Sequence, residues 1–384
     1  MSQIARRNWV VALCAVAVLL AVSWVAAQDS TTSGNVLEEW QQEELQSLVE
    51  VVSAALNGQV ILPAENPFEI RTDFLKGTDG NAYVPFTVSI DPSKVNASAV
   101  AMYLFVIDPV SAQAAAQAAA LIAEEPEAPD RRASVVIDGV AVDVASDEAT
   151  DDSAALPPPA FENAYFTEVT VEGTDPIEVS RAFNVPGGEY DVYLAIRDST
   201  GGVEADAQMA DAASVMLLRH RVSVPNLWDG TLQTSTVLFA ENLVPLDGPL
   251  SPEQQILSPY TIGTTQIEPK ADRSFGKQDE LSLVFLVYNP GLGDESKPDV
   301  TIEYAFFHQT ADAETYFNRT QNQQFNGETL PPTFDLTLGH QIVAGQSVPL
   351  SMFPAGDYRL NIKVTDNVRS TEVIHDLMFN IRET

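Results

Sequence analysis

Two short segments, far apart in the chain, are similar enough to constrain the fold of both halves. Pro186–Asp198 aligns on Pro354–Asp366 without a gap, and each segment opens with proline and glycine, followed by an acidic residue and tyrosine. Proline and glycine favour a tight turn, and the alternating apolar residues that follow favour a strand with one buried face. The landmarks of the repeat are Pro186, Gly188, Tyr190 and Asp198 in the first copy and Pro354, Gly356, Tyr358 and Asp366 in the second.

The tyrosine that begins each repeated strand indicates the architecture. In immunoglobulin-like sandwiches a tyrosine at such a corner donates its hydroxyl hydrogen bond to the backbone a few residues upstream. We therefore expect a duplicated sandwich domain in which Asp198 and Asp366 cap turns. Two independent hairpins of similar composition are the alternative.

The rest of the chain supports a fold that is mainly β. Strand-like runs with a period of two are separated by short turns, as in antiparallel sandwiches. Leu37, Trp40, Leu48 and Val52 instead recur at helical spacing, which predicts a helix that packs against the first domain. The sequence thus predicts two tandem Ig-like antiparallel β-sandwiches with a short N-terminal helix.

The expected domain organisation follows from these patterns and from changes in composition. The segment 112–159 is rich in alanine, proline and acidic residues, and we expect a mobile insertion there, with a folded hairpin flap as the alternative. The predicted parts are a signal peptide at 1–27, an N-terminal segment at 28–66 with a helix at 36–56, a sandwich at 67–245 that contains the insertion 112–159, a linker at 246–259, and a second sandwich at 260–384.

The first residues have the pattern of a secretory signal peptide. Arg6 and Arg7 precede an almost unbroken apolar run, Trp9–Val22, and Val25-Ala26-Ala27 places small residues where signal peptidase cuts. We predict cleavage after Ala27 and a periplasmic or extracellular location. An uncleaved anchor is the alternative, because Trp9–Ala27 is just long enough to span a bilayer.

Cleavage after Ala27 makes a direct prediction about the exported product. N-terminal sequencing of that product should read from Gln28, because the small residues Val25 and Ala27 stand at the positions that signal peptidase recognises. A membrane-bound product that retains Met1 would instead indicate an anchor.

Charge and cysteine content restrict the chemistry and the partners. The net charge is −34, so nucleic acid and anionic membrane surfaces are repelled, and membrane contact is expected only if the leader is uncleaved. We interpret the negative charge as a means of keeping the chain soluble outside the cell. The alternative is that the charge binds Ca²⁺ or a basic partner. Cys14, the single cysteine, lies in the leader, so the exported chain has no thiol for catalysis or metal binding.

No residue pattern predicts a catalytic, cofactor or metal site. The sequence lacks a nucleophile elbow, a zinc-protease helix motif and a phosphate-binding loop. The acidic run around Asp147-Glu148 and Asp151-Asp152 lacks the glycine-punctuated spacing of a Ca²⁺ loop, and we interpret it as a solvated face. The four histidines, which lack metal-ligand spacing and are expected to be satisfied or rim residues, are His220, His308, His340 and His375.

A candidate binding surface comes from the aromatic residues of the second half. Phe306 and Phe307 are adjacent, so in a strand they face opposite sides and one must leave the core. The polar loop that follows contains the amide run 321–324 and could present contacts at one end of the sandwich. The residues that we predict for this surface are Phe307, Tyr316, Phe317 and Phe325.

A wider resemblance covers much of the chain after the leader. Its pieces are 68–74, 83–90, 224–227, 232–243, 259–263, 267–269, 281–290 and 354–366. Together they resemble the uncharacterised Ig-like C-terminal region of secreted acidobacterial-type proteins, which often follows a VWFA-related domain. The metal motif Asp-x-Ser-x-Ser of a VWFA head is missing, because Asp91-Pro92-Ser93 is followed by Val95 where a serine belongs. The resemblance implies no known activity and suggests a separate VWFA-type chain as a partner.

These observations lead to a functional expectation. A duplicated sandwich without a recognisable group of catalytic residues favours an exported, non-enzymatic binding or scaffold protein. Its expected ligand is a protein or a polysaccharide, which the sequence does not identify further. One alternative is a carbohydrate-active or hydrolytic accessory protein. Another is a membrane-anchored structural envelope protein.

Overall fold

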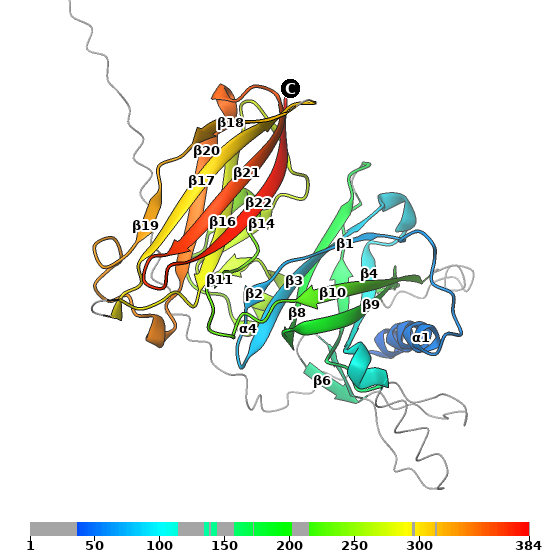
Figure 1. Cartoon of the computed structure of the whole chain (residues 1–384). Helices are drawn as coiled ribbons and strands as arrows, with labels where there is room; N and C mark the ends of the chain where they lie inside the picture. The colour runs from blue at the N-terminus through cyan, green and yellow to red at the C-terminus, as the bar shows by residue number, and fades with distance from the viewer. Residues whose placement is uncertain are drawn as a thin grey trace, which may run out of the picture. The chain divides into compact units, whose positions relative to one another are not determined.

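The computed structural model describes residues 37–113, 134–137, 140–143, 157–171, 173–201, 215–293, 296–311 and 313–383. The predicted signal peptide and most of the predicted insertion lie outside these residues. The described chain is mainly β and divides into two compact units (Figure 1). The N-terminal unit comprises residues up to Thr231 together with Leu243–Ile267, and the C-terminal unit comprises Leu232–Asn242 and the residues from Glu268 onward.

The N-terminal unit is an antiparallel sandwich of two sheets. In the first sheet, β3 (Asn81–Ile90) pairs with β1 (Glu69–Thr72), β2 (Leu75–Lys76) and β8 (Ile177–Pro186). The second has the order β10-β9-β4-β7-β5-β6. Its strands are β4 (Ala99–Ile107), β5 (Ser134–Ile137), β6 (Val140–Asp143), β7 (Phe161–Glu168), β9 (Gly188–Asp198) and β10 (Met216–Val224). Apolar side chains of β3 and β8 pack against those of β4 and β9 to form the core.

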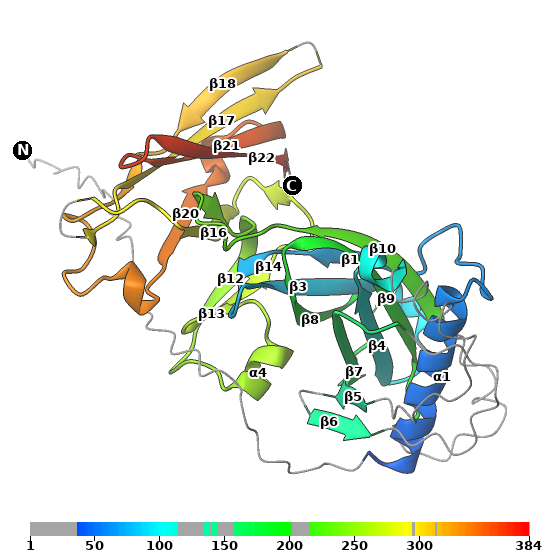
Figure 2. The ribbon, with the colours of Figure 1, turned by 60° about the horizontal axis from the view of Figure 1, so that its bottom comes forward.

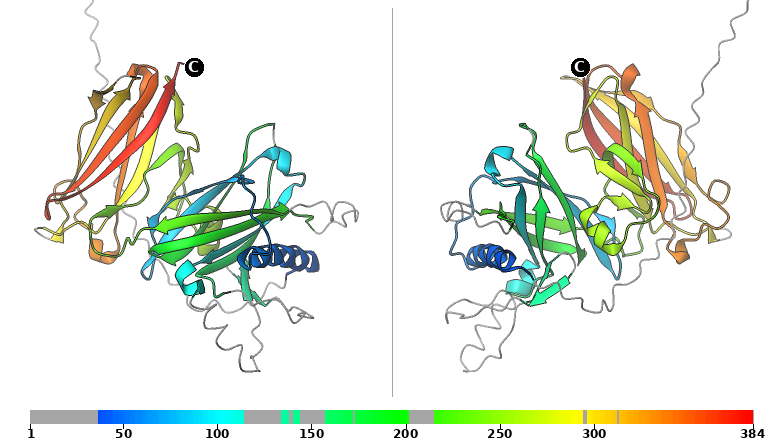
Figure 3. Two further views of the ribbon diagram at one scale, coloured as in Figure 1. Left: turned by 45° about the vertical axis from the view of Figure 1, so that its right-hand side comes forward. Right: turned by 180° about the vertical axis from the view of Figure 1, so that it is seen from behind.

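Helix α1 (Glu39–Leu56) covers the outer face of the second sheet of this unit (Figures 2 and 3). Its apolar residues Leu45, Leu48 and Val52 pack on aromatic and aliphatic side chains of β4, β9 and β10. At the end of β9, the buried carboxylate of Glu44 accepts hydrogen bonds from the Thr200 amide at 2.7 Å and hydroxyl at 2.9 Å. The packing helix expected at 36–56 is confirmed, with its first turn beginning at Glu39.

The C-terminal unit is a second sandwich, antiparallel except for the parallel pair of β15 with β22. One sheet is built on β16 (Glu280–Tyr288), which pairs with β11 (Gln233–Thr234), β12 (Leu238–Pro245) and β20 (Ile342–Pro349). The other has the order β15-β22-β21-β17-β18, with β19 beside β17. Its strands are β15 (Ser274–Gly276), β17 (Val300–Gln309), β18 (Glu314–Arg319), β19 (Gln323–Phe325), β21 (Gly356–Asp366) and β22 (Thr371–Arg382). Side chains from both sheets meet in one core.

The boundary between the units differs from the single linker expected at 246–259. Residues Leu243–Ile267 belong to the N-terminal unit, although Leu232–Asn242 before them belong to the other. This segment contains α4 (Pro252–Leu257) and β13 (Thr261–Ile262), and β14 (Thr265–Pro269) starts in it. The buried Tyr260 holds it in place by donating a hydrogen bond to Asp73 at 2.9 Å. Proline content suggested a linker here, whereas burial of Tyr260 against a distant carboxylate makes the segment part of a folded unit.

The repeated segments form β9 and β21 and have the same strand pairing in the two units. Val100 of β4 is opposite Asp198 of β9, and Val300 of β17 is opposite Asp366 of β21. The register continues in step along both pairs, since Leu104 is opposite Leu194 and Tyr304 is opposite Ile362. Each repeat therefore occupies an equivalent central position in its sheet.

Both repeats also form the hydrogen bond that the tyrosine-corner interpretation predicts. The hydroxyl of Tyr190 donates to the Pro186 carbonyl at 3.0 Å, and that of Tyr358 donates to the Pro354 carbonyl at 2.8 Å. Of the aspartates at the other strand ends, Asp366 caps a turn as expected, because it accepts hydrogen bonds from the Val368 and Arg369 amides that follow it and also from the Gly291 amide. Within the described residues, Asp198 does not bond the turn that follows it; it accepts a hydrogen bond from the amide of Asn96, which is distant in sequence.

Removing either corner hydroxyl should destabilise the unit that contains it. We expect Tyr190→Phe and Tyr358→Phe each to lower the free energy of unfolding by about 1 kcal/mol, because a carbonyl loses its hydrogen bond while the ring stays packed. Urea denaturation followed by tyrosine and tryptophan fluorescence measures the change. Tyr316→Phe is the control, since this side chain is 58% exposed; an equal loss in the control would contradict the role of the corners.

Candidate binding surface

The candidate surface is the outer face of the sheet β22-β21-β17-β18, which we call the C-terminal outer face. Along β21, Tyr358, Leu360 and Ile362 are fully buried in the core. Because neighbouring side chains of a strand point to opposite sides, Arg359, Asn361 and Lys363 lie on the outer face. Figure 1 shows β17, β21 and β22 side by side in this sheet.

One row of side chains crosses all four strands of this face. Strand register places Phe307 opposite both Tyr316 and Arg359, and Arg359 opposite Met378. The ring centroids of Phe307 and Tyr316 are 5.9 Å apart in an edge-to-face arrangement. The Arg359 guanidinium lies 4.3 Å from the centroid of Phe307, within the range of a cation–π contact. The two ends of the row are the most open, with Tyr316 58% and Met378 47% exposed.

Arg359 organises the charges around this row. Its guanidinium donates to both carboxylate oxygens of Glu314, at 2.5 and 2.8 Å, and also to Asp376. The hydrogen bond from Arg359 lowers the pKa of Glu314. The pKa of Asp376 is also lowered, first by a hydrogen bond from the Asn361 amide at 2.8 Å and then by Arg359. Both carboxylates are therefore held ionised, and their hydrogen bonds fix the arginine beside Phe307.

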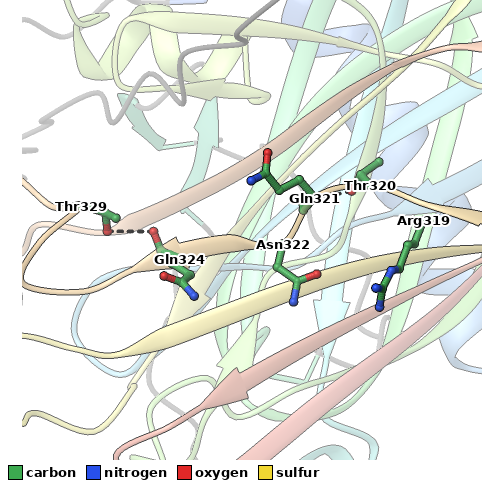
Figure 4. A pocket seen from close by; sticks show the side chains of 6 residues that line it. All are labelled: Arg319, Thr320, Gln321, Asn322, Gln324 and Thr329. Atoms are coloured by element: carbon green, nitrogen blue, oxygen red, sulfur yellow. Dashed lines mark hydrogen bonds between the residues drawn. The ribbon is translucent and has the colours of Figure 1, made fainter.

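A polar hollow of about 560 Å³ lies on the same face, where the chain passes from β18 to β19. Arg319 is opposite Ala305 and Gln324 is opposite Thr301, and both partners are outward positions of β17. Figure 4 shows the side chains of Arg319, Asn322 and Gln324 pointing to one side. We call this site the amide hollow; its lining residues are Arg319, Thr320, Gln321, Asn322, Gln324 and Thr329.

The four aromatic residues predicted for the surface separate into two pairs. Phe307 and Tyr316 lie on the outer face, and Phe306 is buried, which confirms that one of the adjacent phenylalanines leaves the core. The prediction for Phe325 is wrong, because it is only 6% exposed and belongs to the core opposite Val300.

Phe317 is also predicted wrongly as a surface residue. The pairing of β17 with β18 shifts between Phe306 and Phe307, and this bulge adds one residue on β18, so that alternation along the strand is interrupted. Phe317 turns inward and packs on Phe353 and Tyr358, with ring centroids 4.7 and 5.7 Å away. A bulge depends on the partner strand, and nothing in the local sequence of β18 marks it.

Sequence reasoning missed the residues that complete the row. Arg359 and Met378 come from β21 and β22, and neither belongs to the aromatic pattern that led to the prediction. Alternation along the repeat contains a signal for Arg359, since it is the neighbour of the inward-facing Tyr358 and must point outward. Met378 is brought beside Arg359 only by the register of β21 with β22.

The histidines contact other residue types and do not contact each other in the described part of the chain. Nε2 of His375 lies 2.7 Å from the Thr234 hydroxyl, and Nδ1 of His340 accepts a hydrogen bond from the Asp335 amide at 2.9 Å. The His308 ring packs 4.8 Å from that of Tyr358. Burial lowers the pKa of His220 and of His375. In the described part of the chain, no group of three or more potential ligands is placed to hold a metal ion. The acidic run 147–152 lies outside the described residues.

Within the ranges that the structure describes, no helix is both long and apolar enough to cross a membrane.

Comparisons with known proteins define no family. No family model matches the chain, and no curated protein matches it. Among solved structures, a Salmonella alpha-2-macroglobulin mutant is similar over 84% of this chain and 17% of its own length, with 9% identity and a TM-score of 0.17. The native conformation of E. coli alpha-2-macroglobulin is similar over 83% of this chain and 16% of its own, with 8% identity and a TM-score of 0.19. The chain thus spans less than a fifth of the length of either protein.

The Arg359 cluster should make stability depend on pH. Because the pKa values of Glu314 and Asp376 are lowered in the folded state, their stabilising effect is fully present above the ordinary values of 4.5 for glutamate and 3.8 for aspartate. It is lost as the pH falls from these values through the lowered pKa of each folded group. In Arg359→Met this loss on acidification should be smaller than in the unchanged chain. Denaturant unfolding at neutral pH and at steps below pH 4.5 measures the difference.

Lys363→Met is the matched control for this experiment. It removes a positive charge four residues further along β21, where Lys363 pairs with Glu372 at 2.8 Å. If the control flattened the pH dependence as much as Arg359→Met, the specific role of Arg359 would be contradicted.

Proposed function

We propose that this chain is an exported, non-enzymatic binding protein whose ligand contacts the C-terminal outer face. The leader pattern, with its basic start, apolar run and small residues before Gln28, supports export. The observation that supports binding most directly is the row from Tyr316 to Met378 beside the amide hollow. Exposed aromatic and thioether groups next to unengaged polar groups are typical of recognition surfaces.

Comparison of the two units strengthens this proposal. Tyr103 and Phe105 lie on the outer face of the N-terminal unit, buried beneath α1. Strand register makes Glu303 and Ala305 their counterparts in the C-terminal unit. The same framework therefore carries an apolar face beneath a helix in one unit and a polar, accessible face in the other. A charged glutamate and a small alanine, in place of Tyr103 and Phe105, are consistent with a face that meets solvent and ligand.

The electrostatics of the face favour binding over hydrolysis. A glycosidase of the usual kind needs one carboxyl group with a raised pKa, to act as a general acid. Glu314 and Asp376 are the carboxyl groups of the row, and hydrogen bonds lower the pKa of both. Their bonding to Arg359 and Asn361 suits a structural role.

A matched pair of methionine variants tests the proposed surface. Met378 lies in the row, whereas Met352 lies in a 3₁₀ turn (Leu350–Met352) and is 83% exposed. The purified chain, immobilised and exposed to a cell-surface extract of its source, should retain the same components with Met352→Glu as without it. Met378→Glu should retain several times less, because a carboxylate replaces an apolar contact.

Two results would contradict the proposed function. One is equal retention by the unchanged chain and both variants. The other is turnover of a substrate by the purified chain that a single substitution abolishes. Thermal unfolding of each variant establishes that a loss of retention reflects the surface and not the fold.

A further inference from the structure

We infer that the amide hollow binds a neutral polysaccharide through its hydroxyl groups. This inference rests on the proposed function and names the class of ligand for the same face. It is carried by three features: hydrogen bonds that hold the backbone at the hollow, a set of unengaged amides, and an exposed aromatic ring further along β18.

The backbone between the lining residues Asn322 and Gln324 is held by Gln323, which lies opposite the buried Ile302. The side-chain oxygen of Gln323 accepts a hydrogen bond from the buried Tyr304 hydroxyl at 2.9 Å, and its nitrogen donates to the Gly345 carbonyl at 2.6 Å. The Thr329 hydroxyl donates to the Gln324 carbonyl at 2.8 Å and ties the far side of the loop (Figure 4). These bonds hold the backbone of Asn322 and Gln324 in place, so less ordering remains to oppose binding.

The amides next to Gln323 are available to a ligand. Gln321, Asn322 and Gln324 are exposed, and their side chains make no hydrogen bond with any other described residue. An amide offers a donor and an acceptor from one planar group, which suits the neighbouring hydroxyls of a sugar, each of which both donates and accepts. Arg319 adds further donors at the same rim.

The lining argues against the other ligand classes. None of the six lining residues is apolar, whereas protein partners are usually anchored by aromatic or aliphatic side chains in a pocket. The lining has one basic residue in a chain of net charge −34, whereas a polyphosphate ligand requires several. A neutral, hydroxyl-rich ligand is the class that matches both facts.

The aromatic ring of Tyr316 gives the ligand a second contact. Tyr316 is three residues before Arg319 on β18, which corresponds to about 10 Å along a strand, and it lies on the same outer face with 58% of its surface exposed. An exposed ring packs well against the apolar face of a sugar unit. A chain of a few sugar units can therefore contact Tyr316 and the amide hollow together.

Affinity electrophoresis of the purified chain tests this inference. The gels contain dextran, xylan, hydroxyethyl cellulose or, as an acidic probe, polygalacturonate. At least one neutral polysaccharide should retard the chain, and the double variant Asn322→Ala, Gln324→Ala should bind it about tenfold more weakly, the effect of losing two modest hydrogen bonds. Tyr316→Ala should also weaken retardation. The control Gln278→Ala removes an exposed amide elsewhere in the same unit and should bind normally.

Three outcomes would overturn the inference. Retardation by none of the neutral polysaccharides overturns it, and if the immobilised chain still retains components through Met378, the proposed function stands without it. Equal weakening by Gln278→Ala shows that binding occurs elsewhere. Retardation by polygalacturonate alone, abolished in Arg319→Ala, assigns the hollow to an acidic ligand instead.

Discussion

The antiparallel pairing of β17 with β21 is the contact on which the rest of the C-terminal unit depends. Strand side chains alternate, so a shift of one residue would exchange the buried and the exposed sets. The register that pairs Val300 with Asp366 buries Leu360 and Ile362 and turns Arg359 outward. Hydrogen bonds secure both ends of β21, since Tyr358 bonds the Pro354 carbonyl at its start and Asp366 accepts three backbone amides at its end. The row from Tyr316 to Met378 and the amide hollow are positioned by this register.

The same framework supports two different outer faces. In the N-terminal unit an aspartate of the repeated strand, Asp191, pairs with Arg219 of β10 at 2.7 Å. At the corresponding positions of the C-terminal unit the charges are reversed, and Arg359 of β21 pairs with Asp376 of β22. Beside the first ion pair, the outer face of the N-terminal unit is apolar and lies beneath α1. Beside the second, the C-terminal outer face is more polar. Core positions and corner hydrogen bonds are retained in both units, while the outward positions differ, because outward side chains do not determine the packing between sheets.

Prediction from sequence succeeded where structure depends on neighbouring residues in the chain. Alternation and turn residues located the repeated strands, and the tyrosine that opens each one indicated its hydrogen bond. Prediction failed where structure depends on contacts between distant segments. Phe317 turns inward because of a bulge set by β17, Phe325 is buried opposite Val300, and the expected linker is held in the N-terminal unit by Tyr260 and Asp73.

By itself, the sequence determined the β character of the chain, the two tandem sandwiches with a packing helix, and the residues that form both tyrosine corners. These follow from period, turn chemistry and short-range hydrogen bonding, which are local properties. Only the tertiary structure decided which aromatic residues reach the surface, that Arg359 joins Phe307 to Met378, and that three amides surround a hollow. Those arrangements depend on register between strands that are distant in sequence, and register is set by the packing of the whole core.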